Sequence, residues 1–150
     1  MKILTIIGTR PQFIKSATVS QKIKDSDKLT EVIIHTGQHF EKDMSNIFFN
    51  EMNLSKPKYN LGINQMNHGL MTARMKEKIE PIIINEATQC ILVYGDTNST
   101  LAGSITAAKL NIPIFHIEAG LRTNDKYSPF PEEINRRTVS YTHLRAHETE

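Results

Sequence analysis

The sequence is short of cysteine and of long apolar segments, and both shortages limit what the protein can be. Cys90 is the only cysteine among the 150 residues, so an internal disulfide framework is excluded and a reducing compartment is expected. The apolar segment at residues 3–7 is too short for the core of a signal peptide, and no segment approaches transmembrane length. The sequence therefore predicts a cytoplasmic protein with no membrane partner, in which Cys90 is a buried hydrophobic residue.

An excess of charge of one sign is also lacking. The 18 Lys and Arg residues against 16 Asp and Glu residues leave a net charge of +2, which is too small to indicate nucleic acid as a partner. There is no G-x-G-x-x-G turn and no internal repeat. His143 and His147 have the spacing of two helical metal ligands, but no third ligand is apparent, so no metal site is expected. The length is that of about one domain with a real core.

Short β-branched apolar segments alternate with helical patterns along the chain. The apolar segments suit buried strands of a parallel sheet, and the stretches between them are long enough for crossover helices. The predicted strands are residues 3–7, 32–34, 91–94 and 114–117, and the predicted helices are residues 11–24, 41–51, 70–87, 97–110 and one that begins near 131. This alternation predicts an α/β fold.

Two stretches depart from the alternation. Residues 53–68 show no period and are expected to form an irregular loop, in which Tyr59 and Leu61 are able to form an extended edge. Pro81 lies inside the helical pattern of residues 70–87, where it should kink or split the helix.

Two of the predicted strands are each followed by a carboxylate. Asp96 follows the segment that begins at Ile91, and Glu118 follows the one that begins at Ile114. Ligands of open parallel sheets bind beyond the carboxyl ends of the strands, so the two acids are candidates for one site. The alternatives are structural: Asp96 as the N-cap of the next helix, and Glu118 in an ion pair with Arg122.

The turn after the first strand carries positive charge. Arg10 lies in this turn and Lys15 lies near the start of the following helix, whose free N–H groups favour an anion. This arrangement predicts phosphate or pyrophosphate binding, and the alternative is a pair of solvated cations. Gln38 and His39 follow the second strand, where polar side chains are free to meet a ligand. Glu132 begins the helix near residue 131, where acids also serve helix stability alone.

Residues 1–137 resemble the N-terminal half of a non-hydrolysing UDP-N-acetylglucosamine 2-epimerase. Five motifs occur in the order and at the spacing of that family. They are Gly8–Lys15, Thr36–His39, Gly95–Thr100, His116–Arg122 and Pro131–Arg136. The resemblance implies a Rossmann-like parallel sheet with helices on both faces, as the N-terminal domain of a glycosyltransferase-B-like two-domain fold.

The resemblance also implies a reaction. A base removes the proton from carbon 2 of UDP-N-acetylglucosamine while UDP leaves carbon 1, and UDP adds again after reprotonation on the other face. The product is UDP-N-acetylmannosamine, a sugar donor for polysaccharide biosynthesis, and no cofactor is required. The family's residues place Asp96, Glu118 and Glu132 as the acid–base set. They place Arg10, Lys15 and Arg122 as substrate-binding residues.

Regulation and assembly are implied in the same way. Gln38 and His39 match positions that bind a second UDP-sugar as an allosteric activator. Full-length members of the family are commonly homodimers. The family's second domain supplies a further histidine and most uridine contacts, so the chain of 150 residues is expected to be inactive alone.

The sequence departs from the family at two places. Position 12 is Gln where many members carry Glu. Gln at this position is also found in relatives that act on diacetamido uronic acid sugars. Residues 138–150 are polar and lack an apparent core face, so they are expected to be a poorly packed tail foreign to the fold. Four alternatives to the epimerase therefore stay open: an epimerase of a related UDP-sugar, a hydrolysing 2-epimerase, a glycosyltransferase-B sugar transferase and a non-catalytic nucleotide-sugar-binding fragment.

Overall fold

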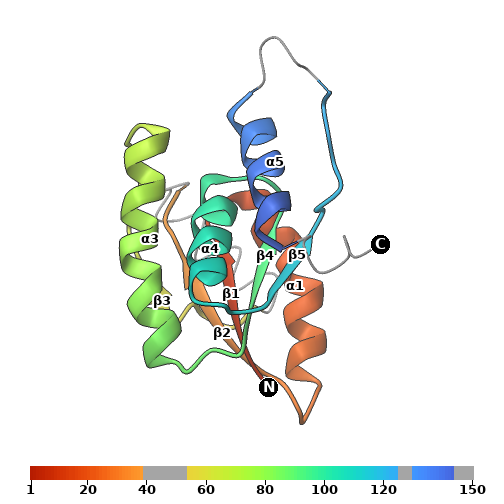
Figure 1. The fold of residues 1–150 in the computed structure, drawn as a ribbon. Coiled ribbons are helices and arrows are strands. Elements are labelled where there is room, and N and C mark those ends of the chain that lie inside the picture. Colours follow the sequence, from red (N-terminus) through yellow and green to blue (C-terminus); the bar gives the residue numbers. More distant parts are fainter. Residues whose placement is uncertain (39–53, 125–129, 144–150) are drawn as a thin grey trace.

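A single parallel sheet forms the centre of the computed structural model, which describes residues 1–38, 54–124 and 130–143. Its five strands lie in the order β3-β2-β1-β4-β5, and each neighbouring pair is parallel (Figure 1). The strands are β1 (Lys2–Ile7), β2 (Thr30–His35), β3 (Tyr59–Asn60), β4 (Cys90–Tyr94) and β5 (Ile114–Ile117). The predicted α/β fold is confirmed, and this strand order is that of a doubly wound nucleotide-binding sheet.

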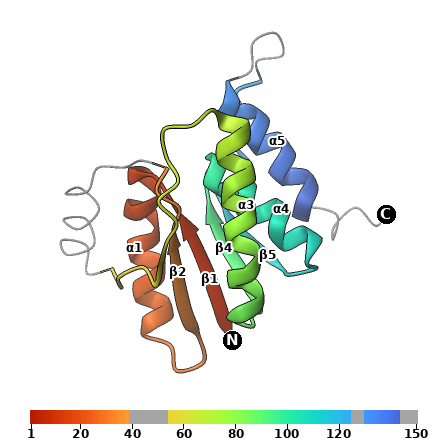
Figure 2. The same ribbon diagram turned by 90° about the vertical axis from the view of Figure 1, so that its left-hand side faces the viewer.

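Helices cover both faces of the sheet, as the resemblance implied. Helix α1 (Arg10–Lys24) lies on one face, and α3 (His68–Asn85), α4 (Asn98–Lys109) and α5 (Pro131–His143) lie on the other (Figure 2). Helix α4 packs between α3 and α5. The helix predicted at residues 41–51 lies outside the described residues.

Two hydrophobic cores separate the sheet from its helices. One contains Leu4, Ile6 and Val93 from the strands with Met75 and Ile79 from α3. The other lies under α1 and contains Ile3, Ile7 and Leu92 with Phe13 and Ile23. Alternate strand residues therefore serve opposite cores, which explains why the strands are apolar throughout. Cys90 is 1% exposed, as predicted.

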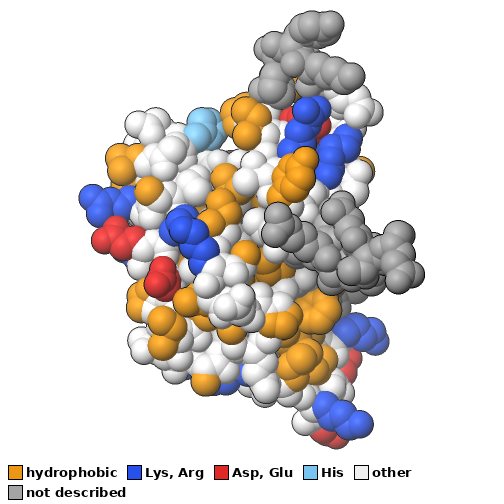
Figure 3. All heavy atoms as spheres, viewed as in Figure 1, with side chains coloured by type: hydrophobic (Ala, Val, Ile, Leu, Met, Phe, Trp, Pro, Cys, Tyr) orange, Lys and Arg blue, Asp and Glu red, His pale blue; other side chains and the backbone are white. Residues whose placement is uncertain are grey.

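Helix α4 lies close to the sheet because its inner face carries small residues. A Cβ atom added at Gly103 would lie 2.6 Å from Ile6 Cδ1 and 3.4 Å from Val93 Cγ1. The outer face of this helical layer exposes hydrophobic side chains among charged ones (Figure 3). Leu70 and Ile84 of α3 and Ile134 of α5 are each about half exposed or more.

The structure corrects two expectations and confirms a third. Pro81 does not split α3, which runs from His68 to Asn85 with Pro81 inside it. The extended edge expected at Tyr59 is confirmed, because Tyr59 pairs with Ile34 at the edge of the sheet. The expectation that residues after 137 lack a core face is wrong at Val139. Helix α5 continues past residue 137, and the Val139 side chain is fully buried.

Among the described residues, no helix has the length and apolar character that a membrane span requires.

Candidate active site

Three loops interlock at the carboxyl edge of the sheet. Thr36, after β2, and Ser99, at the start of α4, lie 2.8 Å apart through their hydroxyl oxygens. A Cβ atom at Gly8, after β1, would lie 2.0 Å from Thr36 Oγ1 and 2.4 Å from Ser99 Oγ. A side chain at position 8 would therefore force the loops apart, so this turn requires glycine.

Gln12 ties two of these loops together from a buried position. Its Oε1 accepts hydrogen bonds from the N–H groups of Gly8 (2.8 Å) and Thr9 (3.1 Å). Its Nε2 donates to the carbonyl oxygen of Tyr94 at 2.8 Å and to the hydroxyl of Thr100 at 3.1 Å. A carboxylate has no proton to donate to Tyr94, so this network fits Gln and not an ionised Glu.

A small cavity of about 180 Å³ opens at this edge. Its lining comes from the loops after β1, β2 and β4, the start of α3 and the start of α5. The lining residues are Thr9, Pro11, Gln38, His68, Asp96, Thr97, Asn98, Pro131, Glu132 and Asn135. Two of the three predicted acid–base residues, Asp96 and Glu132, therefore line one cavity.

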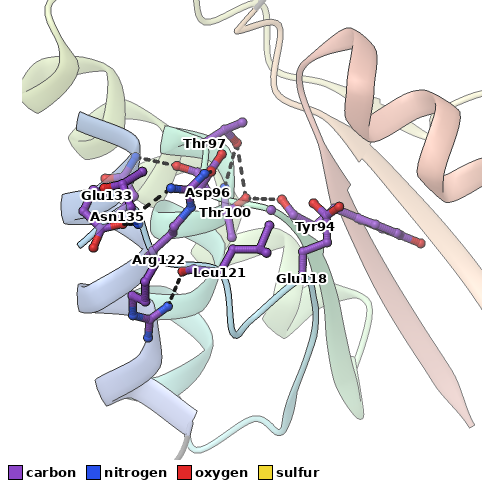
Figure 4. Close-up of polar contacts among 12 residues, drawn as sticks. Tyr94, Asp96, Thr97, Thr100, Glu118, Leu121, Arg122, Glu133 and Asn135 are labelled. Atoms are coloured by element: carbon purple, nitrogen blue, oxygen red, sulfur yellow. Dashed lines mark hydrogen bonds and ion pairs between the residues drawn. The ribbon is translucent and has the colours of Figure 1, made fainter. Parts of the chain in front are cut away.

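Asp96 is held from α5 and does not cap α4. Its carboxylate forms an ion pair with Arg136, and its carbonyl oxygen accepts a hydrogen bond of 2.9 Å from Asn135 Nδ2 (Figure 4). The N-cap of α4 is Thr97, whose hydroxyl accepts from the N–H of Thr100. The alternative reading of Asp96 as the cap is therefore wrong, and its carboxylate is paired with Arg136 at the cavity.

Glu118 lies beside the cavity in an unusual backbone conformation. Its φ angle is +70°, which a non-glycine residue adopts at a cost. Its carboxylate forms an ion pair with Lys15 of α1. The structural alternative, an ion pair between Glu118 and Arg122, is therefore wrong. A Cβ atom at Gly95 would lie 3.5 Å from Glu118 Oε2. Glu118 thus sits over the turn that carries Asp96, although it is not among the residues that line the cavity.

The two adjacent acids of α5 have different environments. Glu132 is exposed and faces the cavity. Glu133 is fully buried and accepts hydrogen bonds from the N–H of Thr123 at 3.0 Å and from Arg137 Nε at 2.9 Å. These donors, with Arg136, lower the pKa of Glu133 to about 2. Glu133 therefore anchors α5 to the preceding loop.

The predicted binding residues are less closely gathered. Arg10 is the first residue of α1 and is exposed. Arg122 turns toward α5, because its Nη1 donates to the carbonyl oxygen of Leu121 at 2.6 Å and its Nη2 to Ser140 Oγ at 2.5 Å (Figure 4). Gln38 lines the cavity, and its Oε1 accepts from the N–H of Ser99 at 3.1 Å. His39 lies outside the described residues.

Three positioning residues, Asn135, Arg136 and His68, were not singled out from the sequence, whereas Gln12 was noted there as a departure from the family. Asn135 and Arg136 hold Asp96, and Gln12 holds the turns. His68 Nδ1 lies 2.9 Å from Asn98 Nδ2 and joins α3 to the start of α4. The sequence did carry a signal for two of them, because Asn135 and Arg136 lie within the motif Pro131–Arg136.

Strand β5 also contacts the turn that contains Gly95, the residue before Asp96. His116 Nε2 lies 2.6 Å from the carbonyl oxygen of Gly95, and burial lowers the pKa of His116. No group of metal-ligating side chains occurs within the described ranges. Two carboxylate–cation pairs stand at this edge of the sheet, Asp96 with Arg136 and Glu118 with Lys15.

Comparison with known proteins relates this arrangement to one family. The family model described as UDP-N-acetylglucosamine 2-epimerase matches residues 21–148. A Pseudomonas aeruginosa protein named UDP-2,3-diacetamido-2,3-dideoxy-D-glucuronate 2-epimerase is 56% identical over 136 residues, which are 91% of this chain and 38% of that protein. A Methanocaldococcus jannaschii UDP-N-acetylglucosamine 2-epimerase is 44% identical over 91% of this chain and 36% of its own length.

Solved structures agree with the sequence matches. The M. jannaschii UDP-GlcNAc 2-epimerase in complex with UDP-GlcNAc and UDP superposes with a TM-score of 0.89 at 42% identity, covering 95% of this chain and 39% of that one. The Neisseria meningitidis UDP-GlcNAc 2-epimerase bound to UDP-GlcNAc gives a TM-score of 0.88 at 36% identity, with 95% and 38% covered. The chain thus spans less than two fifths of the length of these relatives.

Proposed function

This chain belongs to the UDP-N-acetylglucosamine 2-epimerase family, and we propose that it forms the nucleotide-sugar-binding N-terminal half of an enzyme that inverts carbon 2 of a UDP-sugar. The observation that carries the proposal is the meeting of Asp96 and Glu132 in one cavity with Glu118 beside it. Carboxylates from three separate elements at the ligand-binding edge of a sheet suit proton transfer on both faces of a sugar.

In the proposed reaction a carboxylate removes the proton from carbon 2 while UDP leaves carbon 1. A 2-acetamidoglucal results, and reprotonation on the opposite face followed by return of UDP gives the epimer. Asp96, Glu118 and Glu132 form the proposed acid–base set. Arg10 and Lys15 lie on α1, where they would balance the negative charge that grows on the departing diphosphate. Arg122 remains a proposed substrate contact on the loop that follows Glu118.

Two substrates are supported by different observations. UDP-GlcNAc is favoured by the relatives that are named for it and by the ligand-bound structures at TM-scores of 0.88 and above. A UDP-diacetamido uronic acid is favoured by the 56% identity to the P. aeruginosa protein. We propose UDP-GlcNAc as the first substrate to test, with UDP-ManNAc as its product.

A chimaera tests the proposal. Residues 1–137 replace the matching part of the P. aeruginosa relative, and the purified chimaera is incubated with each UDP-sugar in deuterium oxide. We expect the epimer to form, with deuterium at carbon 2 detected by proton NMR. The 150-residue chain alone should give no epimer. Free sugar as the product would instead support a hydrolysing enzyme, and the absence of exchange with either sugar would contradict the proposal.

Variants of the chimaera test the acid–base set. Asp96→Asn, Glu118→Gln and Glu132→Gln should each lower turnover by about 100-fold or more, as expected for loss of a general acid or base. Glu77→Gln is the matched control, because Glu77 is exposed on α3 with its side chain 65% accessible. Equal activity of all four variants would remove these residues from the mechanism.

The proposal also covers the oligomeric state of the full-length protein, its regulation and the boundary of the N-terminal domain. We propose a cytoplasmic homodimer for the full-length protein, with a second domain that closes over the cavity and a place in polysaccharide biosynthesis. Gln38 and His39 are the proposed contacts of an activating UDP-sugar. The boundary at residue 137 is likewise proposed, and a limited-proteolysis experiment on the chimaera checks it.

A further inference from the structure

We propose that Lys15 exchanges partners when substrate binds: it holds Glu118 in the empty site and moves to the diphosphate in the occupied one, which uncovers the Glu118 carboxylate. This inference rests on the proposed function, because it requires a diphosphate at the start of α1. It adds a step that the proposed acid–base roles do not contain, namely that the substrate itself releases one of the acids that act on it.

The ion pair between Lys15 and Glu118 joins α1 to the segment that follows β5, at the carboxyl edge of the sheet. Lys15 Nζ and Glu118 Oε2 are in direct contact, although the residues are 103 positions apart. Their side chains are 38% and 32% exposed, so solvent and a ligand reach both. Within the part of the chain that the structure describes, this is the single ion pair that Lys15 makes.

Glu118 is placed by its backbone and not by Lys15. Its φ of +70° directs the residue over the β4–α4 turn, where Gly95, itself at φ +62°, leaves the space beneath the carboxylate open. Backbone strain of this kind persists where the surrounding structure enforces it. The β4 and β5 ladder and the contact of His116 with Gly95 enforce it here. Loss of Lys15 from the pair would therefore leave Glu118 in position.

Asp96 provides the contrast. Its partner Arg136 is 17% exposed and also contacts Glu133 at 3.4 Å, while Glu133 is anchored to Thr123 and Arg137. Arg136 is thus held by a network and is not available to leave. Lys15 is a flexible side chain whose partner is the single carboxylate of Glu118. Lysine binds phosphate as a mobile point charge.

The strengths of the competing interactions allow the exchange. An ion pair with this exposure changes an equilibrium by up to about fivefold. A diphosphate carries at least two negative charges, whereas the Glu118 carboxylate carries one. Lysine is therefore expected to leave a single carboxylate for the diphosphate.

A double-mutant cycle on the 150-residue chain tests the exchange. UDP and inorganic pyrophosphate are titrated at low ionic strength into the wild type, Lys15→Met, Glu118→Gln and the double variant, with binding followed by calorimetry and amide NMR. We expect Glu118→Gln to tighten UDP binding about two- to fivefold, because it frees Lys15, and Lys15→Met to weaken it. In the Lys15→Met background, Glu118→Gln should give no gain. Circular dichroism checks that the variants fold.

The control cycle uses Lys22→Met and Asp25→Asn, a pair at the C-terminal end of the same helix with side chains 81% and 53% exposed. This pair should show no coupling with UDP.

An equal gain from Glu118→Gln in the wild-type and Lys15→Met backgrounds would mean simple charge repulsion and would overturn the exchange alone. Weaker binding by Glu118→Gln would also overturn it. No binding of UDP or pyrophosphate by any variant or the wild type would overturn the exchange, whereas the proposed function is decided by epimer formation in the chimaera.

Discussion

Glu132 and Glu133 are neighbours in α5 but have opposite surroundings. Glu132 faces the cavity and is exposed, whereas Glu133 is fully buried against Thr123 and two arginines. One helical step of about 100° is enough to separate them. A residue proposed to act in catalysis and a residue that anchors the helix can therefore follow each other directly in the chain.

The two acids should respond differently to the same substitution. The pKa of Glu133 is lowered to about 2 by the Thr123 N–H and then by Arg137 and Arg136, so its stabilisation is present above the unfolded value of about 4.3 and is lost as the pH falls toward 2. Glu133→Gln should lower stability at pH 7 and flatten the acid limb of the stability curve. Urea unfolding at several pH values measures both effects.

Glu132→Gln provides the comparison in the same experiment. It should leave the unfolding midpoint at pH 7 within experimental error and reduce turnover of the chimaera. If Glu133→Gln were as stable as the wild type at pH 7, the anchoring role of the buried carboxylate would be wrong.

At the scale of elements, α4 sets the geometry of the site. Its start carries Thr97 and Ser99, which fasten the neighbouring loops, and its middle lies against β1 and β4 through Gly103. A displacement of α4 would therefore move Asp96 and the loops that contact it.

Two helical glycines should respond to alanine with opposite signs. Gly103→Ala places a Cβ 2.6 Å from the buried Ile6 Cδ1, and overpacking of this kind costs about 1–3 kcal/mol. Gly69→Ala in α3 meets nothing nearer than 3.8 Å and should stabilise by up to about 1 kcal/mol through helix propensity. Thermal unfolding of both variants tests the difference, and a stabilising Gly103→Ala would contradict the close packing of α4.

At the scale of the whole molecule, a buried histidine links the stability of the fold to pH. His35 ends β2, is 3% exposed and lies with its ring 5.1 Å from that of Phe13. Burial lowers the pKa of His35 to about 4. The folded protein therefore resists a proton that the unfolded chain accepts at about pH 6.5.

Stability should fall as the pH drops from about 6.5 to 4. The sign follows because the unfolded state binds more protons in this window, and the loss attributable to His35 is up to about 3 kcal/mol. His35→Leu should flatten this part of the curve, with His116 contributing a smaller loss of the same sign. Urea unfolding at pH 7 and pH 4.5 measures the change. An unchanged slope in His35→Leu would assign the loss to other groups.

Periodicity and apolar segments were sufficient to predict β1, β2, β4 and β5 and the helices α1, α3, α4 and α5, because each depends on neighbouring residues. The exception was β3, whose two residues depend on pairing with β2. Position 139 shows the same limit: a polar composition indicated a loose tail, but packing of α5 buries Val139.

The sequence by itself determined that carboxylates and cations would stand at the ends of particular strands and helices, since these positions follow from the order of residues. Only the tertiary structure decided their partners. Arg136 pairs with Asp96 and Lys15 with Glu118 across 40 and 103 positions of chain, and Thr97 is the N-cap of α4, for which the sequence offered Asp96 only as an alternative. Such pairings depend on how separate elements meet in space, which local sequence patterns do not encode.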